Sequence, residues 1–254
     1  MIHFAAYKAV GESVQNPLMY YKNNFYSLLN TLSAQKEFGI NNIIFSSSAT
    51  VYGNPEVLPI TKANEVQRPF SPYGNTKKIS EEILDDFTNS EDHFNAISLR
   101  YFNPIGAHDS GLIGELPNGI PNNLMPYITQ NAAGIREKLT VFGDDYPTKD
   151  RTAIRDYIHV VDLAKAHVKA INRLVANKQK YSMEYFNLGT GTGYSIMDVI
   201  KTFEAVTGAK LNYEISGRRD GDLTALYTAT KLAEDKLGWK AERELDNMIA
   251  TSWA

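Results

Sequence analysis

Short apolar runs alternate along the chain with longer segments whose apolar residues recur at helical spacing. Runs rich in β-branched and aromatic residues at 43–45, 96–101 and 185–188 are typical of buried strands. The spacing predicts helices over 18–38 and from Tyr73 through Phe87, the second opened by Ser71 as N-cap and Pro72 in the first turn. Strands that alternate with helices in this way predict an α/β protein with a parallel sheet.

The alternation stops near Ala107. Glycine, proline and asparagine gather between Gly106 and Pro126, which indicates that the chain leaves the sheet for a smaller lobe. A short strand at 140–142 and a capping box at Ser195 fit such a lobe. We therefore expect residues 1–106 to form the sheet domain and residues 107–254 to form mainly the second lobe, with 157–190 returning to the sheet.

Composition narrows the class of protein. The 254 residues are 43% hydrophobic and 22% charged, which is ordinary for a globular domain. A net charge of −3 gives no reason to expect nucleic acid or an anionic membrane as partner. The sequence has no cysteine, which excludes disulfides and thiol catalysis and fits a reducing compartment, so a cytoplasmic location is expected. His159 has no acidic or histidine cluster around it, so we expect it to hydrogen-bond and expect no metal site.

Three residues suggest chemistry at the end of a strand. Ser48 follows the run 43–45, and Tyr73 and Lys77 lie four apart on the next helix, where they share a face. A neighbouring ammonium and the helix N-terminus both favour phenolate, so we expect the pKa of Tyr73 to fall. With Ser48 as proton relay, the group can deprotonate an alcohol while hydride moves from its carbon to a nicotinamide. The alternative is a structural Tyr-x-x-x-Lys pair on a solvated helix face.

These residues resemble the Ser-Tyr-Lys triad of the extended short-chain dehydrogenases. Within that group, four longer strings are similar to the UDP-glucose 4-epimerase family: SSSATVYG (46–53), LRYFNPIGAH (99–108), GIPNNLMPYI (119–128) and RDYIHVVDLA (155–164). The similarity extends from Ile2 to Trp253. It implies a partial Rossmann-like, doubly wound parallel sheet without its first strands, and a smaller C-terminal α/β lobe that binds substrate.

The resemblance also implies an activity. It is the NAD-dependent, reversible epimerisation of UDP-galactose and UDP-glucose at C4 through a 4-keto intermediate, and also of the corresponding N-acetylhexosamine pair. Ser48, Tyr73 and Lys77 would be the catalytic residues. A homodimer would form through the helix at 18–38 and the helix that carries Tyr73.

The resemblance assigns further residues to two sides of a site. On the NAD side, besides the triad, it places Phe4, Ala5, Ala6, Tyr7, Lys8, Asn23 and Phe102. On the UDP-hexose side, besides Ser48, it places Tyr101, Asn103, Asn123, Leu124, Thr140, Phe142, Arg155, Arg219, Asp222 and Leu226.

Several of these residues also suggest roles by their chemistry. Asn103 at a strand end can bond sugar or phosphate oxygens, or can form an Asx-turn before Pro104. Phe142 can pack on a flat base or simply in the core. Arg155 and Arg219 can clamp a diphosphate, and Asp222 can bond ribose hydroxyls, although arginines are also common on surfaces.

The sequence departs from a complete dinucleotide-binding domain at its start. No G-x-x-G-x-x-G precedes Ile2, and the cluster from Gly189 to Gly193 is interpreted as a turn. The resemblance implies roughly seventy further residues, about two βα units, in front of Met1. The chain is therefore expected to be truncated, with an exposed sheet edge, and to be inactive and unable to hold NAD by itself.

Two alternatives stay open. A sugar-nucleotide 4,6-dehydratase would carry an Asp-Glu pair directly after the hydroxyl residue, whereas Ala49 and Thr50 stand here. A non-catalytic sugar-nucleotide sensor, or an inactive fragment, is the other. An intact triad argues against an evolved sensor and says nothing against a fragment.

Overall fold

A parallel sheet organises the first part of the chain. The computed structural model describes residues 1–117, 119–219 and 222–254. The sheet holds β1 (Ile2–His3), β2 (Asn42–Ser48), β3 (Asn95–Tyr101) and β7 (Met183–Leu188), in the order β1-β2-β3-β7. All three pairings are parallel, and β1 is an edge strand paired with β2. Because β7 joins from far downstream, the chain returns to this sheet after the second lobe has begun.

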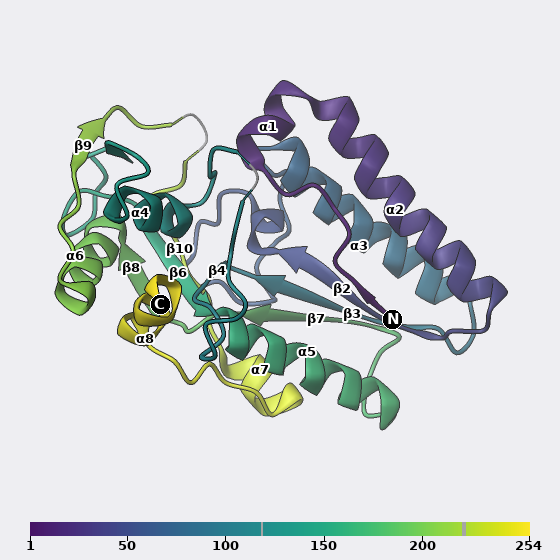
Figure 1. Ribbon diagram of the computed structural model, residues 1–254. Coiled ribbons are helices and arrows are strands. Elements are labelled where there is room, and N and C mark those ends of the chain that lie inside the picture. Colours follow the sequence, from purple (N-terminus) through teal and green to yellow (C-terminus); the bar gives the residue numbers. More distant parts are fainter. Residues whose placement is uncertain (118, 220–221) are drawn as a thin grey trace.

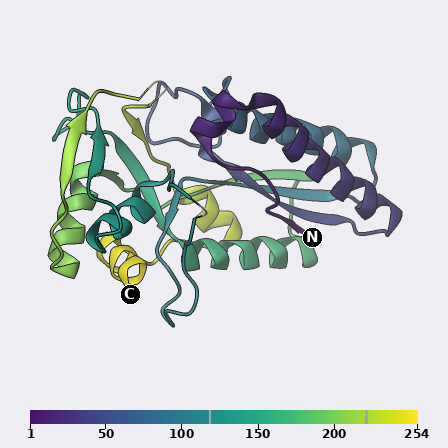
Figure 2. The same ribbon diagram turned by 45° about the horizontal axis from the view of Figure 1, so that its top comes forward.

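Helices cover both faces of the sheet (Figures 1 and 2). One face carries α1 (Val10–Gln15), α2 (Pro17–Glu37) and α3 (Pro72–Ser90), and the other carries α5 (Val160–Val175) and α7 (Lys231–Leu237). Alternate residues of β2 feed the two cores: Ile43 packs with Leu28 and Leu84, whereas Ile44 packs with Leu163. This layered arrangement confirms the doubly wound α/β fold.

The start of α3 is determined by local sequence. The Ser71 side chain accepts a hydrogen bond from the Gly74 backbone N–H at 3.1 Å, and Pro72 occupies the first turn. The predicted N-cap is therefore confirmed, and it fixes where Tyr73 and Lys77 begin their face of the helix.

The second lobe is built from shorter elements. Strands β4 (Asn103–Ile105), β6 (Ile154–His159) and β10 (Ala225–Leu226) run parallel in the order β10-β6-β4, and β8 (Gly193–Ser195) pairs antiparallel with β6. A separate parallel pair joins β5 (Leu139–Phe142) to β9 (Tyr213–Ser216). With α4 (Leu124–Ala132), α6 (Ile196–Thr207) and α8 (Leu245–Trp253), these strands enclose a second core. The division of the chain at residues 106 and 107 stays a prediction.

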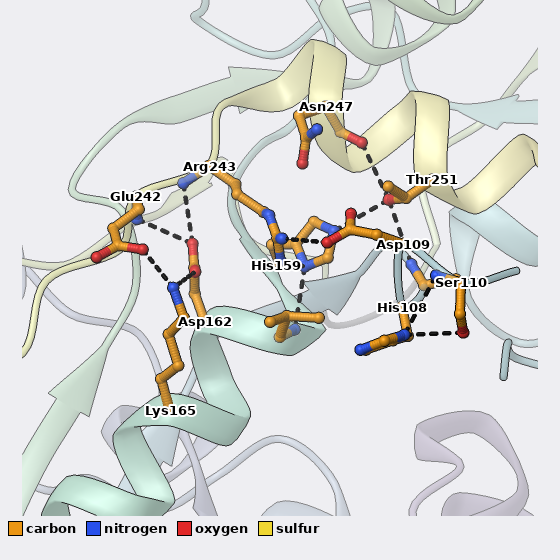
Figure 3. Close-up of polar contacts among 12 residues, drawn as sticks. His108, Asp109, Ser110, His159, Asp162, Lys165, Glu242, Arg243, Asn247 and Thr251 are labelled. Atoms are coloured by element: carbon orange, nitrogen blue, oxygen red, sulfur yellow. Dashed lines mark hydrogen bonds and ion pairs between the residues drawn. The ribbon is translucent and has the colours of Figure 1, made fainter.

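A polar cluster fastens α8 to the start of α5 (Figure 3). His159 Nδ1 accepts from the Val161 N–H at 3.0 Å, and its Nε2 lies 3.0 Å from Thr251 Oγ1. Arg243 lies beside His159 and donates to Asp109 at 2.6 Å. These contacts give His159 the hydrogen-bonding role expected of it. Among the described residues, no group of side chains could hold a metal ion, and no helix is long and apolar enough to cross a membrane.

Candidate active site

The three candidate catalytic residues meet at the carboxyl end of β2. Ser48 ends that strand and caps the short 3-10 helix η1 (Ala49–Tyr52), where its Oγ accepts from the Thr50 N–H at 3.3 Å. The Ser48 side chain lies beside the phenol of Tyr73, which is in the first turn of α3. One turn later, Lys77 Nζ donates to the Ser46 carbonyl at 2.6 Å and lies 6.0 Å from the centre of the Tyr73 ring. The structure therefore brings the predicted triad together.

The protonation of the triad differs from the prediction. Burial raises the pKa of Tyr73 above its ordinary value, and the neighbouring Ser48 hydroxyl opposes this only in part. The expectation that Lys77 lowers this pKa is wrong for the protein alone, because the ammonium is directed at the Ser46 carbonyl and not at the phenol. Burial also lowers the pKa of Lys77 to about 8, which the carboxylate of Glu81 partly offsets. Lys77 thus gains or loses its charge near physiological pH.

The segment Phe4–Lys8 continues from β1 and is largely exposed. Asn24, buried on α2, holds this segment by accepting from the Tyr7 N–H at 2.8 Å and donating to the Tyr7 carbonyl at 3.1 Å. It also donates to Thr76 Oγ1 on α3 at 2.9 Å. Sequence analysis assigned its neighbour Asn23 and missed Asn24, although an asparagine inside a long helix is itself a signal.

The remaining residues assigned to the NAD side lie around this segment and under the serine turn. Asn23 donates to Asn24, and the Phe4 ring lies 4.9 Å from that of His167. Lys8 pairs with Glu115 at 3.4 Å. Phe102 is buried and packs with Ala49, Val51, Tyr52, Ile60 and Leu226. The assigned residues therefore surround the ends of β1 and β2.

Two arginines, a carboxylate and an aromatic ring meet in the second lobe. Arg155 donates to Asp222 Oδ1 at 3.1 Å, and Arg219 donates to Asp222 Oδ2 at 3.2 Å. The Arg219 guanidinium lies 4.7 Å from the centre of the Phe142 ring. Four residues predicted from three separate segments are thus neighbours, with Thr140 two positions before Phe142 on β5. Residues 220 and 221, which the sequence places in the same stretch, lie outside the described residues.

Other predicted substrate residues lie between the triad and the arginine cluster or at its border. Leu226 is buried, and its neighbours Ala49 and Phe102 belong to the serine turn and the end of β3. Tyr101 pairs in register with Ser48, and its ring lies 5.8 Å from that of His167.

Three further predicted substrate residues lie on elements of the second lobe. Asn103 is the first residue of β4, and among the described residues its side chain forms no hydrogen bond. Asn123 directly precedes α4, where its side chain makes no capping hydrogen bond, and it donates to Glu115 at 3.4 Å; Leu124 is the first residue of that helix. Glu115 also pairs with Lys8, so it joins the Asn123 turn to the segment after β1.

Asp156 is a site residue that sequence reasoning missed. Its carboxylate is fully buried, and it accepts from the Thr190 N–H and hydroxyl, both at 2.8 Å, from the Gly191 N–H at 3.1 Å and from the Thr228 N–H at 3.3 Å. Burial raises the pKa of Asp156, and these four donors oppose that rise. Asp156 thereby fixes the glycine-rich turn, interpreted correctly as a turn, against the strand of Leu226.

Comparison with known proteins places this geometry in a family. The family model described as GDP-mannose 4,6 dehydratase matches residues 1–252. A UDP-glucose 4-epimerase from Mus musculus is 50% identical over 253 residues, which are 100% of this chain and 72% of that protein. The Drosophila melanogaster UDP-glucose 4-epimerase is 51% identical over 251 residues, 99% of this chain and 71% of that protein. The chain therefore spans about seven tenths of their length.

Solved structures agree with the sequence comparison. The UDP-glucose 4-epimerase of Bifidobacterium longum, in complex with NAD+ and UDP, superposes with a TM-score of 0.94 at 50% identity and covers 99% of this chain and 74% of that one. The Brucella ovis UDP-glucose 4-epimerase, in complex with NAD, gives a TM-score of 0.92 at 42% identity over 99% of this chain and 76% of that one. The resemblance seen in the sequence is confirmed, and this chain belongs to the UDP-glucose 4-epimerase family.

Proposed function

We propose that the protein interconverts UDP-galactose and UDP-glucose at C4 through a 4-keto sugar. The observation that supports this most strongly is the pairing of two unlike sites. A Ser48–Tyr73–Lys77 cluster lies at the end of a parallel sheet, and a cationic and aromatic cluster lies in the adjoining lobe. Related epimerases hold NAD and UDP. This reaction requires acid–base chemistry at the sugar and tight binding of the nucleotide.

The residues at the sheet end fit the nicotinamide part of NAD. An ammonium has three N–H donors, and within the described residues Lys77 Nζ makes one hydrogen bond, to Ser46. Two donors are therefore left for the hydroxyls of a ribose. When bound, NAD supplies the acceptor and donor for the C4 hydride and a positive charge that favours the Tyr73 phenolate.

Tyr73 is the proposed base. Its phenolate takes the proton of the sugar 4-hydroxyl and becomes the phenol, and Ser48, which lies beside it, orients or passes that proton. Because the pKa of Tyr73 alone lies above its ordinary value, ionisation depends on added positive charge. A bound oxidised cofactor would supply that charge, so Tyr73 would act as a base only with the cofactor in place.

The lobe cluster is the proposed anchor for UDP. Arg155 and Arg219 present guanidinium N–H groups that suit diphosphate oxygens, and Phe142 offers a flat face for the base. Asp222 holds both arginines in place before substrate arrives. The bonds to UDP do not change during the reaction, so they position the sugar without choosing which face of C4 receives hydride.

Leu226 is the proposed boundary of the sugar site. Its side chain is buried between the serine turn and β3, and the ring of the next residue, Tyr227, faces Gly193 on the other side of the strand. Tyr227 therefore does not fill the space beside Leu226. A leucine here leaves room for a group on C2, so we propose measurable activity on UDP-N-acetylglucosamine in addition to the main pair.

A 4,6-dehydratase is the alternative that the family model's description raises. Elimination of water needs an acid and a base besides the triad. The two residues after Ser48 are Ala49, which is buried against apolar side chains, and Thr50. Neither carries a carboxylate, so the geometry favours epimerisation.

The test compares three proteins. Assayed as the full-length protein, wild type should convert UDP-galactose to UDP-glucose with added NAD, and Tyr73→Phe should lose at least about a thousandfold in turnover while its affinity for UDP in calorimetry stays within twofold. Tyr185→Phe, which removes a phenol bonded to Asp85, is the matched control and should keep its activity. Activity of Tyr73→Phe within tenfold of wild type would remove Tyr73 from this role.

We also propose that the protein forms a homodimer through α2 and α3. Leu18, Tyr26 and Leu29 are exposed apolar residues on α2. Burying such a surface against a second copy gives the largest favourable free energy available to that face. Light scattering should give twice the chain mass for wild type and a smaller mass for Leu29→Glu; a monomeric wild type would contradict the proposal.

A further inference from the structure

Glu81 lies one turn after Lys77, on the same face of α3, and is buried with it. Its carboxylate binds Arg100 of β3 by two bonds, from Nε at 2.9 Å and from Nη2 at 2.7 Å. The Ser98 hydroxyl donates to the same carboxylate at 2.6 Å. A buried carboxylate with three donors is held in one position, and that position is fixed relative to Lys77 by the helix.

Arg100, the partner of Glu81, extends the hydrogen-bond network toward Ser48. Arg100 Nη1 donates to the Tyr52 hydroxyl at 2.8 Å, and Tyr52 donates to Asn187 of β7 at 2.8 Å. The guanidinium lies between two rings, 5.0 Å from the centre of Tyr52 and 4.6 Å from that of Tyr185. Tyr52 is the last residue of the short 3-10 helix that Ser48 caps. The network thus connects the helix of Lys77 with the turn of Ser48.

Three polar residues on this face of α3 each bind a different strand of the sheet. Lys77 reaches the Ser46 carbonyl of β2, Glu81 reaches Ser98 and Arg100 of β3, and Asp85 accepts from the Tyr185 hydroxyl of β7 at 2.8 Å. Of the two carboxylates, Glu81 is nearer in sequence to Lys77 than Asp85 is, and Glu81 forms a buried ion pair with Arg100.

We infer that Glu81 is a positioning residue for the reaction: its buried carboxylate, held by Arg100 and Ser98 one helical turn from Lys77, keeps Lys77 charged. The inference rests on the proposed function for its catalytic meaning. Supporting it, the Lys77 pKa is lowered by burial and raised by Glu81. Of the other groups near Lys77, Tyr73 is neutral, and His3 of β1 has a pKa of about 4 and is uncharged above pH 6. Arg100 binds Glu81 from β3, whereas Lys77 precedes Glu81 by one turn of the same helix. Among the described residues, Glu81 is the charged group that favours the protonated form of Lys77.

The experiment follows Lys77 directly. Lysine side chains labelled with carbon-13 at Cε are titrated by NMR in the full chain, and the signal of Lys77 is assigned by its absence in Lys77→Arg. In wild type the Lys77 signal should have a midpoint near 8, well below the ordinary lysine value of about 10.4. Glu81→Gln removes the charge with little change of shape, and the midpoint should fall by about one pH unit or more.

Two matched variants separate charge from structure. Asp85→Asn makes the same carboxylate-to-amide change one turn further along the same face, and its Lys77 midpoint should stay at the wild-type value. Glu81→Asp keeps the charge, so it should also keep that midpoint even where the shorter side chain weakens folding. A Lys77 midpoint that does not move in Glu81→Gln, or that moves equally in Glu81→Asp, overturns the inference.

The pH profile of turnover tests whether Glu81 affects the reaction through Lys77. In Glu81→Gln the fall of kcat on the alkaline side should begin about one pH unit lower than in wild type, and in Asp85→Asn it should stay in place. A purely structural role for Glu81 would lower kcat equally at every pH, which contradicts the inference. If wild type shows no epimerisation while the NMR midpoint still moves, the proposed function fails and the link between Glu81 and Lys77 stands.

Discussion

Replacing Asp156 by asparagine should weaken both the fold and the sugar site. The two Thr190 donors share Oδ1, which an amide oxygen can replace, whereas Oδ2 accepts from the N–H groups of Gly191 and Thr228. The amide of asparagine would present its own N–H groups to these two donors. The Gly191 N–H is only partly buried and can turn to water, but the Thr228 N–H is buried and would be left without a partner.

The magnitude follows from these two lost bonds. An unsatisfied buried donor costs about 1–3 kcal/mol, and a lost hydrogen bond to a charged group costs a similar amount. Part of this is offset because the variant no longer buries a charge. We therefore expect a loss of roughly 3 kcal/mol in the free energy of unfolding, measured by urea titration at pH 7 with an unchanged m-value.

The same change should reach the substrate, because Thr228 lies two residues beyond Leu226 on the segment that Asp156 holds. We expect kcat/KM for UDP-galactose to fall roughly tenfold. Asp145→Asn, an exposed acid paired with Arg218, is the control and should change neither quantity appreciably. A loss of stability below about 1 kcal/mol in Asp156→Asn, with kcat/KM unchanged, would refute the idea that this carboxylate organises the turn.

Two further predictions concern substrate choice and acid sensitivity. Leu226→Tyr should reduce activity on UDP-N-acetylglucosamine relative to UDP-galactose by tens of fold, because a packing difference of this size is worth ~1–3 kcal/mol; paired assays that give an unchanged ratio would show that Leu226 is not the boundary. Burial, with the charge of Lys77, lowers the pKa of His3 to about 4, so between pH 6.5 and 4 the unfolded chain binds a proton that the folded chain does not. Stability contributed by neutral His3 is present above pH 6.5 and is lost as the pH falls toward 4, and His3→Gln should flatten that part of the stability curve; an equally steep decline in the variant would exclude His3 as its source.

Local signals predicted the elements that carry the triad. Ser71 and Pro72 determine where α3 begins, and four-residue spacing then places Lys77 beside Tyr73 without any knowledge of the rest of the chain. The apolar run before Ser48 likewise predicted β2 and the position of the serine at its end. These features depend on neighbours in sequence, so the sequence was sufficient for them.

Partners distant in sequence could not be predicted in the same way. Asp156 meets donors 34 and 72 positions away, and Arg100 meets Glu81 across the interface between helix and sheet. Nothing in the spacing of these residues indicates that they face one another. The pKa of Tyr73 was predicted in the wrong direction for a related reason: spacing showed the neighbouring cation but not the desolvation of the phenol, which depends on the packing of the whole site.

The arginine cluster could be predicted from the sequence only in part. The chemistry of Arg155, Arg219, Asp222 and Phe142 suggested a diphosphate and base site, and the family resemblance joined segments that sequence spacing alone leaves separate. The structure shows that they are neighbours. Their role toward UDP, the cytoplasmic location and the domain boundaries remain predictions.

In the proposed epimerisation, hydride leaves C4 of the sugar and returns to the same carbon. The most direct measurement is the conversion of UDP-galactose carrying deuterium at C4, in the presence of NAD, with the product analysed by mass spectrometry and proton NMR. The proposed reaction should yield UDP-glucose that keeps its deuterium at C4, with no deuterium released to water. UDP-glucose that has exchanged this deuterium for solvent hydrogen, or a dehydrated sugar in its place, would contradict it.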